Sequence, residues 1–151
     1  VVDFGSKGTV KYDTKSNVDT SNDAYLLGSS DGVYLISFSV GIVSNAISTE
    51  QLIDASAFLE VATDGSTFAA LHGSGSHVED SAGNETGSVT RSGTVIYKAT
   101  TATTKIRVRT HANTVSSANY TIAHEVQSLI SATQSASQGS RCTFLSIVRI
   151  A

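Results

Sequence analysis

Short apolar runs that alternate with polar residues constrain the fold of this chain more than any other feature of its sequence. The clearest run covers residues 33–40. In an extended strand, one face of this run carries Tyr34, Ile36, Phe38 and Val40. The opposite face also carries apolar or small side chains, which predicts a central strand that is covered on both sides.

Similar runs recur along the chain and predict strands at residues 56–62, 67–71, 87–91, 93–98, 105–111 and 142–150. Asp64 and Gly65 stand between two of these runs and predict a tight hairpin turn. Residues 120–130 fit both helical and strand spacing, and the β-rich flanks favour a strand while a helix stays the alternative. Gly- and Ser-rich residues 72–86 and 131–140 predict loops. About eight short strands at this length are typical of an all-β sandwich or jelly roll.

Composition narrows the class of protein further. The 151 residues fit a single domain covering 1–151, and a net charge of -3 leaves no basic surplus, so we expect no nucleic-acid partner. No apolar run is long enough to span a membrane, so we expect no membrane insertion. Cys142 is the one cysteine, so an intramolecular disulfide is excluded and we expect it to act as a small buried hydrophobe. Stability must therefore come from packing or association.

Several of these segments resemble the tumour necrosis factor and complement globular-head superfamily, over about residues 4–151. The run Asp31-Gly-Val-Tyr-Leu-Ile-Ser-Phe38 is similar to the Gly-x-Tyr-x-Phe strand of that family. The final run, residues 143–149, is similar to its closing strand, and residues 59–65 stand where the family has a strand ending in a Gly turn. Tyr12-Asp13 and Tyr25 occupy places seen in phage and bacterial relatives.

The resemblance implies an antiparallel two-sheet jelly roll that assembles as a homotrimer and binds rather than catalyses. It implies a head at the tip of a viral, phage or bacterial fibre, outside the cell or on the virion surface. Its partners would be copies of itself, a host or prey surface receptor that could be a glycan, and an N-terminal stalk of the same polypeptide. The absence of Met, with Val1 first, fits a module of a longer fibre protein. No cofactor is expected.

Two alternatives to a receptor-binding head follow from the same residues. The chain could be a capsid or appendage protein whose role is trimerisation alone. A glycan-processing enzyme is the less favoured alternative, because the sequence shows neither a paired carboxylate motif nor a Ser-His-Asp pattern.

In a two-layer sandwich, a strand that is apolar on both faces must have each face shielded from water by another surface. One cover is the second sheet, and a neighbouring copy of the chain is a natural second cover. We therefore assign to the core or to a trimer interface four residues of the first and last predicted strands, namely Tyr34, Phe38, Phe144 and Ile147.

Residues 105–111 carry the strongest candidate binding pattern. Lys105, Arg107, Arg109 and His111 alternate with Ile106 and Val108, so one face of the predicted strand is basic. Arginines on such a face can bind carboxylates, sulfate or acidic sugars. An ordinary solvated outer face is the alternative.

Other candidate ligands lie on the predicted loops. His72 and His77 could bind zinc only with a third ligand such as Glu79 or Asp80, and no such metal is part of our prediction. The acidic residues 79–85 could supply oxygen ligands to Ca²⁺, but an ordinary solvated polar loop is the favoured interpretation of both patterns. Tyr120 is a candidate platform for a sugar ring, and also an ordinary strand residue.

Overall fold

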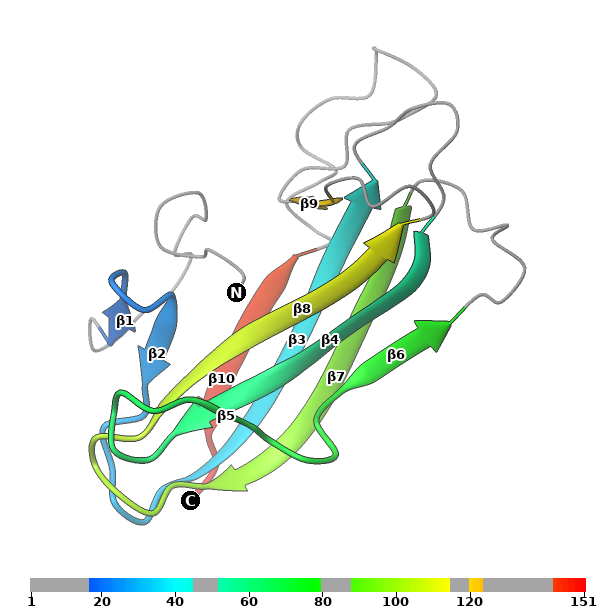
Figure 1. Cartoon of the computed structure of the whole chain (residues 1–151). Coiled ribbons are helices and arrows are strands. Elements are labelled where there is room, and N and C mark those ends of the chain that lie inside the picture. Colours follow the sequence, from blue (N-terminus) through cyan, green and yellow to red (C-terminus); the bar gives the residue numbers. More distant parts are fainter. Residues whose placement is uncertain (1–16, 45–51, 80–87, 115–119, 124–142) are drawn as a thin grey trace, which may run out of the picture.

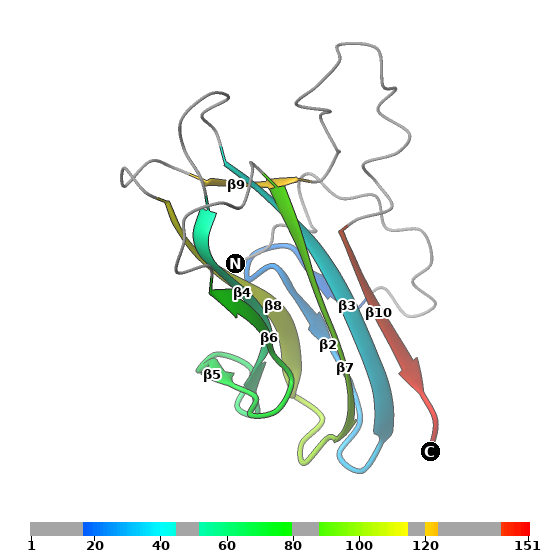
Figure 2. The ribbon, with the colours of Figure 1, turned by 90° about the vertical axis from the view of Figure 1, so that its right-hand side faces the viewer.

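A computed structural model describes residues 17–44, 52–79, 88–114, 120–123 and 143–151 of the chain. These residues form two antiparallel sheets that face each other (Figures 1 and 2). The described part of the chain contains strands and turns and no helix. The all-β, two-sheet architecture expected from the alternating pattern is therefore confirmed.

The six-stranded sheet has the order β1-β2-β8-β4-β5, and β6 also pairs with β4. Its strands are β1 (Val18–Asp19), β2 (Ala24–Leu26), β4 (Leu52–Ala62), β5 (Ala69–Ala70), β6 (Ser76–Glu79) and β8 (Lys105–Thr114). The four-stranded sheet has the order β10-β3-β7, and β9 also pairs with β3. Its strands are β3 (Val33–Ser44), β7 (Ser88–Lys98), β9 (Tyr120–Ala123) and β10 (Phe144–Arg149).

Strand β3 is the centre of the four-stranded sheet, as its two apolar faces predicted. It pairs with β7 from Val33 to Val43, while β10 and β9 share its other edge (Figure 1). The two strands predicted at 87–91 and 93–98 are in fact one strand, β7. Gly93 does not interrupt it, because the glycine continues the ladder opposite Phe38.

The connections differ from the sequence predictions in three places. The segment 72–86 was predicted as a loop, but its residues 76–79 form β6, because they pair with Asp54–Ala57 of β4. The strand predicted at 67–71 shortens to β5. Residues 120–123 form strand β9, in line with the favoured strand prediction, whereas residues 124–130 lie outside the described residues.

The core lies between the two sheets and is built by the inward-facing alternate residues of β3, β4 and β8. Its most deeply buried large side chains are Phe38, Ile36, Leu59, Ile106, Val40 and Val108. Tyr97, Leu145 and Ile147 pack against its margin. Burial of the Tyr97 ring raises the pKa of its hydroxyl. Because side chains alternate along a strand, each strand directs one set of residues into the core between the two sheets and the other set away from it.

Gly93 marks a place where the two sheets approach too closely for a side chain. A Cβ at this position would lie 2.6 Å from the backbone oxygen of Ser74 and 2.7 Å from Cε1 of Phe38. Ser74 itself is buried, and its hydroxyl donates to Leu71 O at 2.6 Å and accepts from Leu59 N at 3.0 Å. The turn before β6 is therefore tied to β4 and seated against β7.

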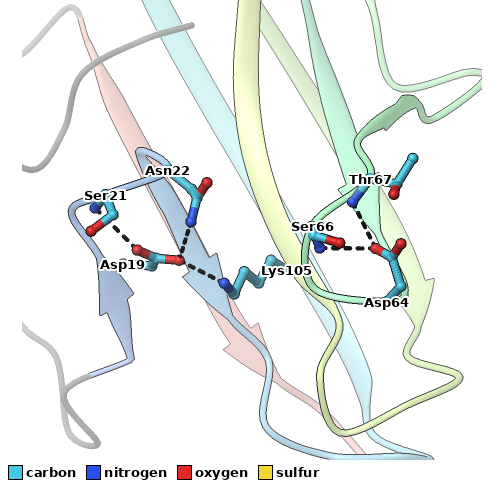
Figure 3. A network of polar contacts seen from close by, with 7 residues as sticks. All are labelled: Asp19, Ser21, Asn22, Asp64, Ser66, Thr67 and Lys105. Atoms are coloured by element: carbon cyan, nitrogen blue, oxygen red, sulfur yellow. Dashed lines mark hydrogen bonds and ion pairs between the residues drawn. The ribbon is translucent and has the colours of Figure 1, made fainter.

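Figure 3 shows two separate groups of polar contacts, one around Asp19 and one around Asp64. Lys105 at the start of β8 donates to Oδ2 of Asp19 at 2.7 Å, and the same oxygen accepts from the Asn22 side chain at 2.8 Å. These contacts, led by Lys105, lower the pKa of Asp19 to about 2. The small hairpin of β1 and β2 is thereby fastened to β8.

The turn after β4 has its own carboxylate cap. Oδ1 of Asp64 accepts from the backbone N–H groups of Ser66 at 2.8 Å and Thr67 at 2.7 Å (Figure 3). Hydrogen bonds from Thr67 and Ser66 hold the pKa of Asp64 well below its usual range. Gly65 has a φ of 80°, which explains the preference for glycine after Asp64 in this predicted hairpin turn.

Candidate functional site

The outer face of the four-stranded sheet is apolar. Among the residues whose side chains the structure describes, five large hydrophobic side chains are exposed, and all belong to this face: Leu35, Ile96, Phe144, Val148 and Ile150. We call these five residues the apolar face. Ile96 is 66% exposed, although it stands in the middle of a well-paired region of β7.

Strand register makes this face continuous at one end. Leu35 pairs with Ile96 on one side and with Val148 on the other, so the three side chains form one row across the sheet. Ile150 extends the next row, because its N–H donates to Val33 O at 2.8 Å. The row on the other side contains only hydroxyl residues, namely Ser146, Ser37 and Thr94, with Ser37 Oγ 3.1 Å from Thr94 Oγ1.

The four residues predicted for core or interface divide between these two environments. Tyr34 and Phe38 are buried in the core, and Ile147 packs against it from β10. Phe144 instead belongs to the apolar face, where it is part of the row with Ser39 and Ser92.

The outer face of the six-stranded sheet has a different character. Strands β4 and β8 place three residue pairs side by side on it: Ser56 with His111, Phe58 with Arg109, and Glu60 with Arg107. We call these six residues the charged face. The predicted alternation of β8 is confirmed, because Ile106 and Val108 are fully buried while the basic residues lie on the opposite side.

A single buried carboxylate organises the charged face. Oε2 of Glu60 accepts from Nε of Arg107 at 2.7 Å, and its Oε1 lies 3.5 Å from Nη1 of Arg109. The Arg107 guanidinium is also covered by the Phe68 ring, whose centroid lies 3.8 Å from the guanidinium carbon. The Arg107 side chain is therefore only 17% exposed, whereas that of Arg109 is 48% exposed.

The remaining predicted ligand residues are only partly brought together. His77 on β6 pairs with Ser56, which also pairs with His111, so the two histidine positions flank β4 in one row. His72 is exposed in the turn between β5 and β6. Tyr120 begins β9 of the other sheet. The described residues contain no cluster of three His, Cys, Asp or Glu that could hold a metal, and the acidic residues 80–85 lie outside them, as does Cys142.

Sequence reasoning missed Glu60, Phe58 and Phe68 as members of this region. The two phenylalanines read as ordinary strand residues, and Glu60 is the one charged residue in an apolar run. That isolated charge was the available signal, because a carboxylate in an apolar strand needs a cationic partner. Its partner could not be named without the register between β4 and β8.

Of the comparisons with known proteins, the one with solved structures found similar chains. No protein-family model matches the chain, and no curated protein matches it. Among solved structures, the Eiger TNF from S. frugiperda is similar, with 12% identity and a TM-score of 0.49 over 80% of this chain. The match covers 60% of the length of that structure. The two-sheet assignment rests on the strand pairing itself.

The described residues also include no helix with the length and apolar character of a membrane span.

Proposed function

We propose that this chain is a non-catalytic binding head that associates with copies of itself through the apolar face to form a homotrimer. The observation that carries the proposal is the row of Val148, Leu35 and Ile96, which is apolar, continuous and exposed. Contiguous apolar surface on a sheet face is unfavourable in water and marks an interaction site. Cover by identical chains is the simplest arrangement, because most oligomers of soluble proteins are symmetric assemblies of one chain.

The rest of the same face supports close approach of a second copy. Beyond the apolar row, Ser37 is flanked by Thr94 and Ser146, and the next row joins Ser92 and Ser39 to the exposed Phe144. The small hydroxyl side chains leave the row of Ser37 flat, and they can form hydrogen bonds across an interface. Among the described residues of this face, charged side chains lie at one margin only. There, Nζ of Lys98 is 3.4 Å from Oδ1 of Asp31.

We further propose that the assembled head binds a receptor on a host or prey surface, with a glycan as the favoured class. It would act outside the cell or on a virion surface, at the tip of a fibre. Three equivalent sites on one rigid head would raise a weak affinity by avidity. An assembly module without a ligand is the second candidate, and it shares the apolar face but predicts no binding of a surface molecule.

Light scattering coupled to size-exclusion chromatography tests the assembly. The expected mass is three times the 15.7 kDa of one chain. Leu35→Glu should reduce the measured mass to that of one chain, because the substitution places a charge in the centre of the apolar row. Ala102→Glu is the matched control, since Ala102 is exposed on the turn between β7 and β8.

A monomeric wild-type chain would contradict the proposal. A trimer that survives Leu35→Glu would also contradict it, by placing the interface elsewhere. Circular dichroism of the variant separates loss of assembly from loss of folding.

A further inference from the structure

We propose that the charged face holds a binding site for a saccharide that carries a carboxylate group, centred on Arg109 and Phe58. The site lies on one chain and does not depend on the proposed assembly. The first argument for it concerns the charges at the centre of this face. Arg107 and Arg109 share the single carboxylate of Glu60, so the three side chains together carry one surplus positive charge.

The surplus charge is located on Arg109. Glu60 and Arg107 form the short contact, 2.7 Å, and the Phe68 ring covers Arg107. The distance from Arg109 to Glu60 is 3.5 Å, at the outer limit of a hydrogen bond. A guanidinium has five N–H donors in a rigid fork, and nearly half of the Arg109 side chain surface is in contact with solvent. Arg109 is therefore the residue that can bind a ligand.

Its neighbours hold Arg109 in place before any ligand arrives. Glu60 draws the guanidinium toward β4, and it is itself fixed by Arg107 beneath the Phe68 ring. Glu60 and Arg107 are thus positioning residues in this proposal. A planar carboxylate can accept two parallel hydrogen bonds from the fork of a guanidinium, whereas a spherical anion cannot.

The residues around Arg109 favour a sugar as the carrier of that carboxylate. Phe58 is the direct cross-strand neighbour of Arg109, and its ring is partly exposed on the same face. The next row supplies the Ser56 hydroxyl and the exposed His111. A cation for the acidic group, an aromatic ring for the apolar side of a pyranose, and polar groups for its hydroxyls together match an acidic monosaccharide unit.

Titration followed by NMR tests the site on the full chain. The probe is the methyl glycoside of glucuronic acid, at constant ionic strength, with the neutral methyl glucoside and inorganic sulfate as comparison ligands. Saturable shift changes are expected at Phe58, Arg109 and His111 with the acidic sugar alone. Arg109→Gln should weaken binding about tenfold, because one charge-assisted pair is lost.

Lys98→Gln is the matched control, because it removes one positive charge from the other sheet and should leave binding unchanged. The monomer-forming Leu35→Glu should also bind with unchanged affinity, so failure of the assembly proposal and of this one can be told apart. Should Arg109→Gln fail to fold, Phe58→Leu gives the same test through the ring. The proposal is overturned if the acidic sugar produces no saturable shifts, or if Lys98→Gln weakens its binding as much as Arg109→Gln does. It is also overturned if sulfate binds as tightly as the acidic sugar, or if an acidic peptide binds more tightly.

Discussion

At the scale of single residues, Tyr34 shows how one side chain serves both the core and a connection. Its ring is buried in the core, and its hydroxyl donates to the backbone oxygen of Leu27 at 2.7 Å. A Cβ on Gly32 would lie 2.8 Å from the tyrosine hydroxyl oxygen, so the preceding turn also needs its glycine. The Gly-x-Tyr order in the sequence thus reflects a packing requirement.

Tyr34→Phe should lower the free energy of unfolding by about 1–2 kcal/mol, because it leaves a buried carbonyl oxygen without its donor. Urea denaturation measures the change. Tyr97→Phe is the control, since the described residues show no hydrogen bond from its hydroxyl and the two tyrosines are cross-strand partners. An equal effect of both substitutions would show that the Leu27 contact adds nothing to stability.

A second prediction at this scale concerns the Asp19 carboxylate. Its pKa of about 2 lies below the ordinary value of 3.8, so its contribution to stability is complete above that ordinary value and is lost as pH falls through 2. Lys105→Met should return the pKa of Asp19 toward 3.8 and weaken this acid dependence. NMR titration of the side-chain carboxyl groups measures the pKa, and urea denaturation at a series of pH values measures the acid dependence of stability.

Asp64 provides the internal control for that titration, because its pKa is lowered by Thr67 and Ser66 within its own turn. Its pKa should not respond to Lys105→Met. A shift of Asp64 comparable to that of Asp19 would indicate that the whole end of the sandwich had rearranged, and that the ion pair is not the cause.

At the scale of elements, the contact between the two sheets at Gly93 sets how β6 and β7 meet. Gly93→Ala should destabilise the fold by about 1–3 kcal/mol, because the new methyl group must displace either the Ser74 backbone or the Phe38 ring. A lower thermal midpoint is the expected readout. Ser92→Ala, at an exposed neighbouring position of β7, should change it little. Similar losses in both variants would argue against the close approach.

Elements with strong alternation were predictable, and short paired segments were not. Strand β3 was identified because its period of two extends over eight residues with large side chains. Strand β6 was missed because Ser76, His77 and Glu79 are polar, and only pairing with β4 makes them a strand. The basic residues of β8 were found by alternation alone. Their carboxylate and aromatic partners on β4 and near β5 depend on register between distant strands, which local pattern does not contain.

At the scale of the whole molecule, burial of the apolar face between copies would couple stability to concentration. The thermal midpoint should rise by about 2–4 °C for each tenfold increase in protein concentration. Leu35→Glu should remove this dependence, and Ala102→Glu should keep it. Scanning calorimetry over two decades of concentration provides the measurement. A midpoint independent of concentration in the wild-type chain would contradict burial of this face.

The pairing of β3 with both β7 and β10 also has a consequence for biosynthesis. Phe144 of β10 pairs with Ser39 of β3. Strand β3 therefore cannot complete its pairing until β10, which is synthesised much later, has left the ribosome. Non-local pairing of this kind slows folding and prolongs the exposure of apolar strand edges. Nascent chains that stop before β10 would therefore present β3 with one open edge, making them natural clients for chaperones.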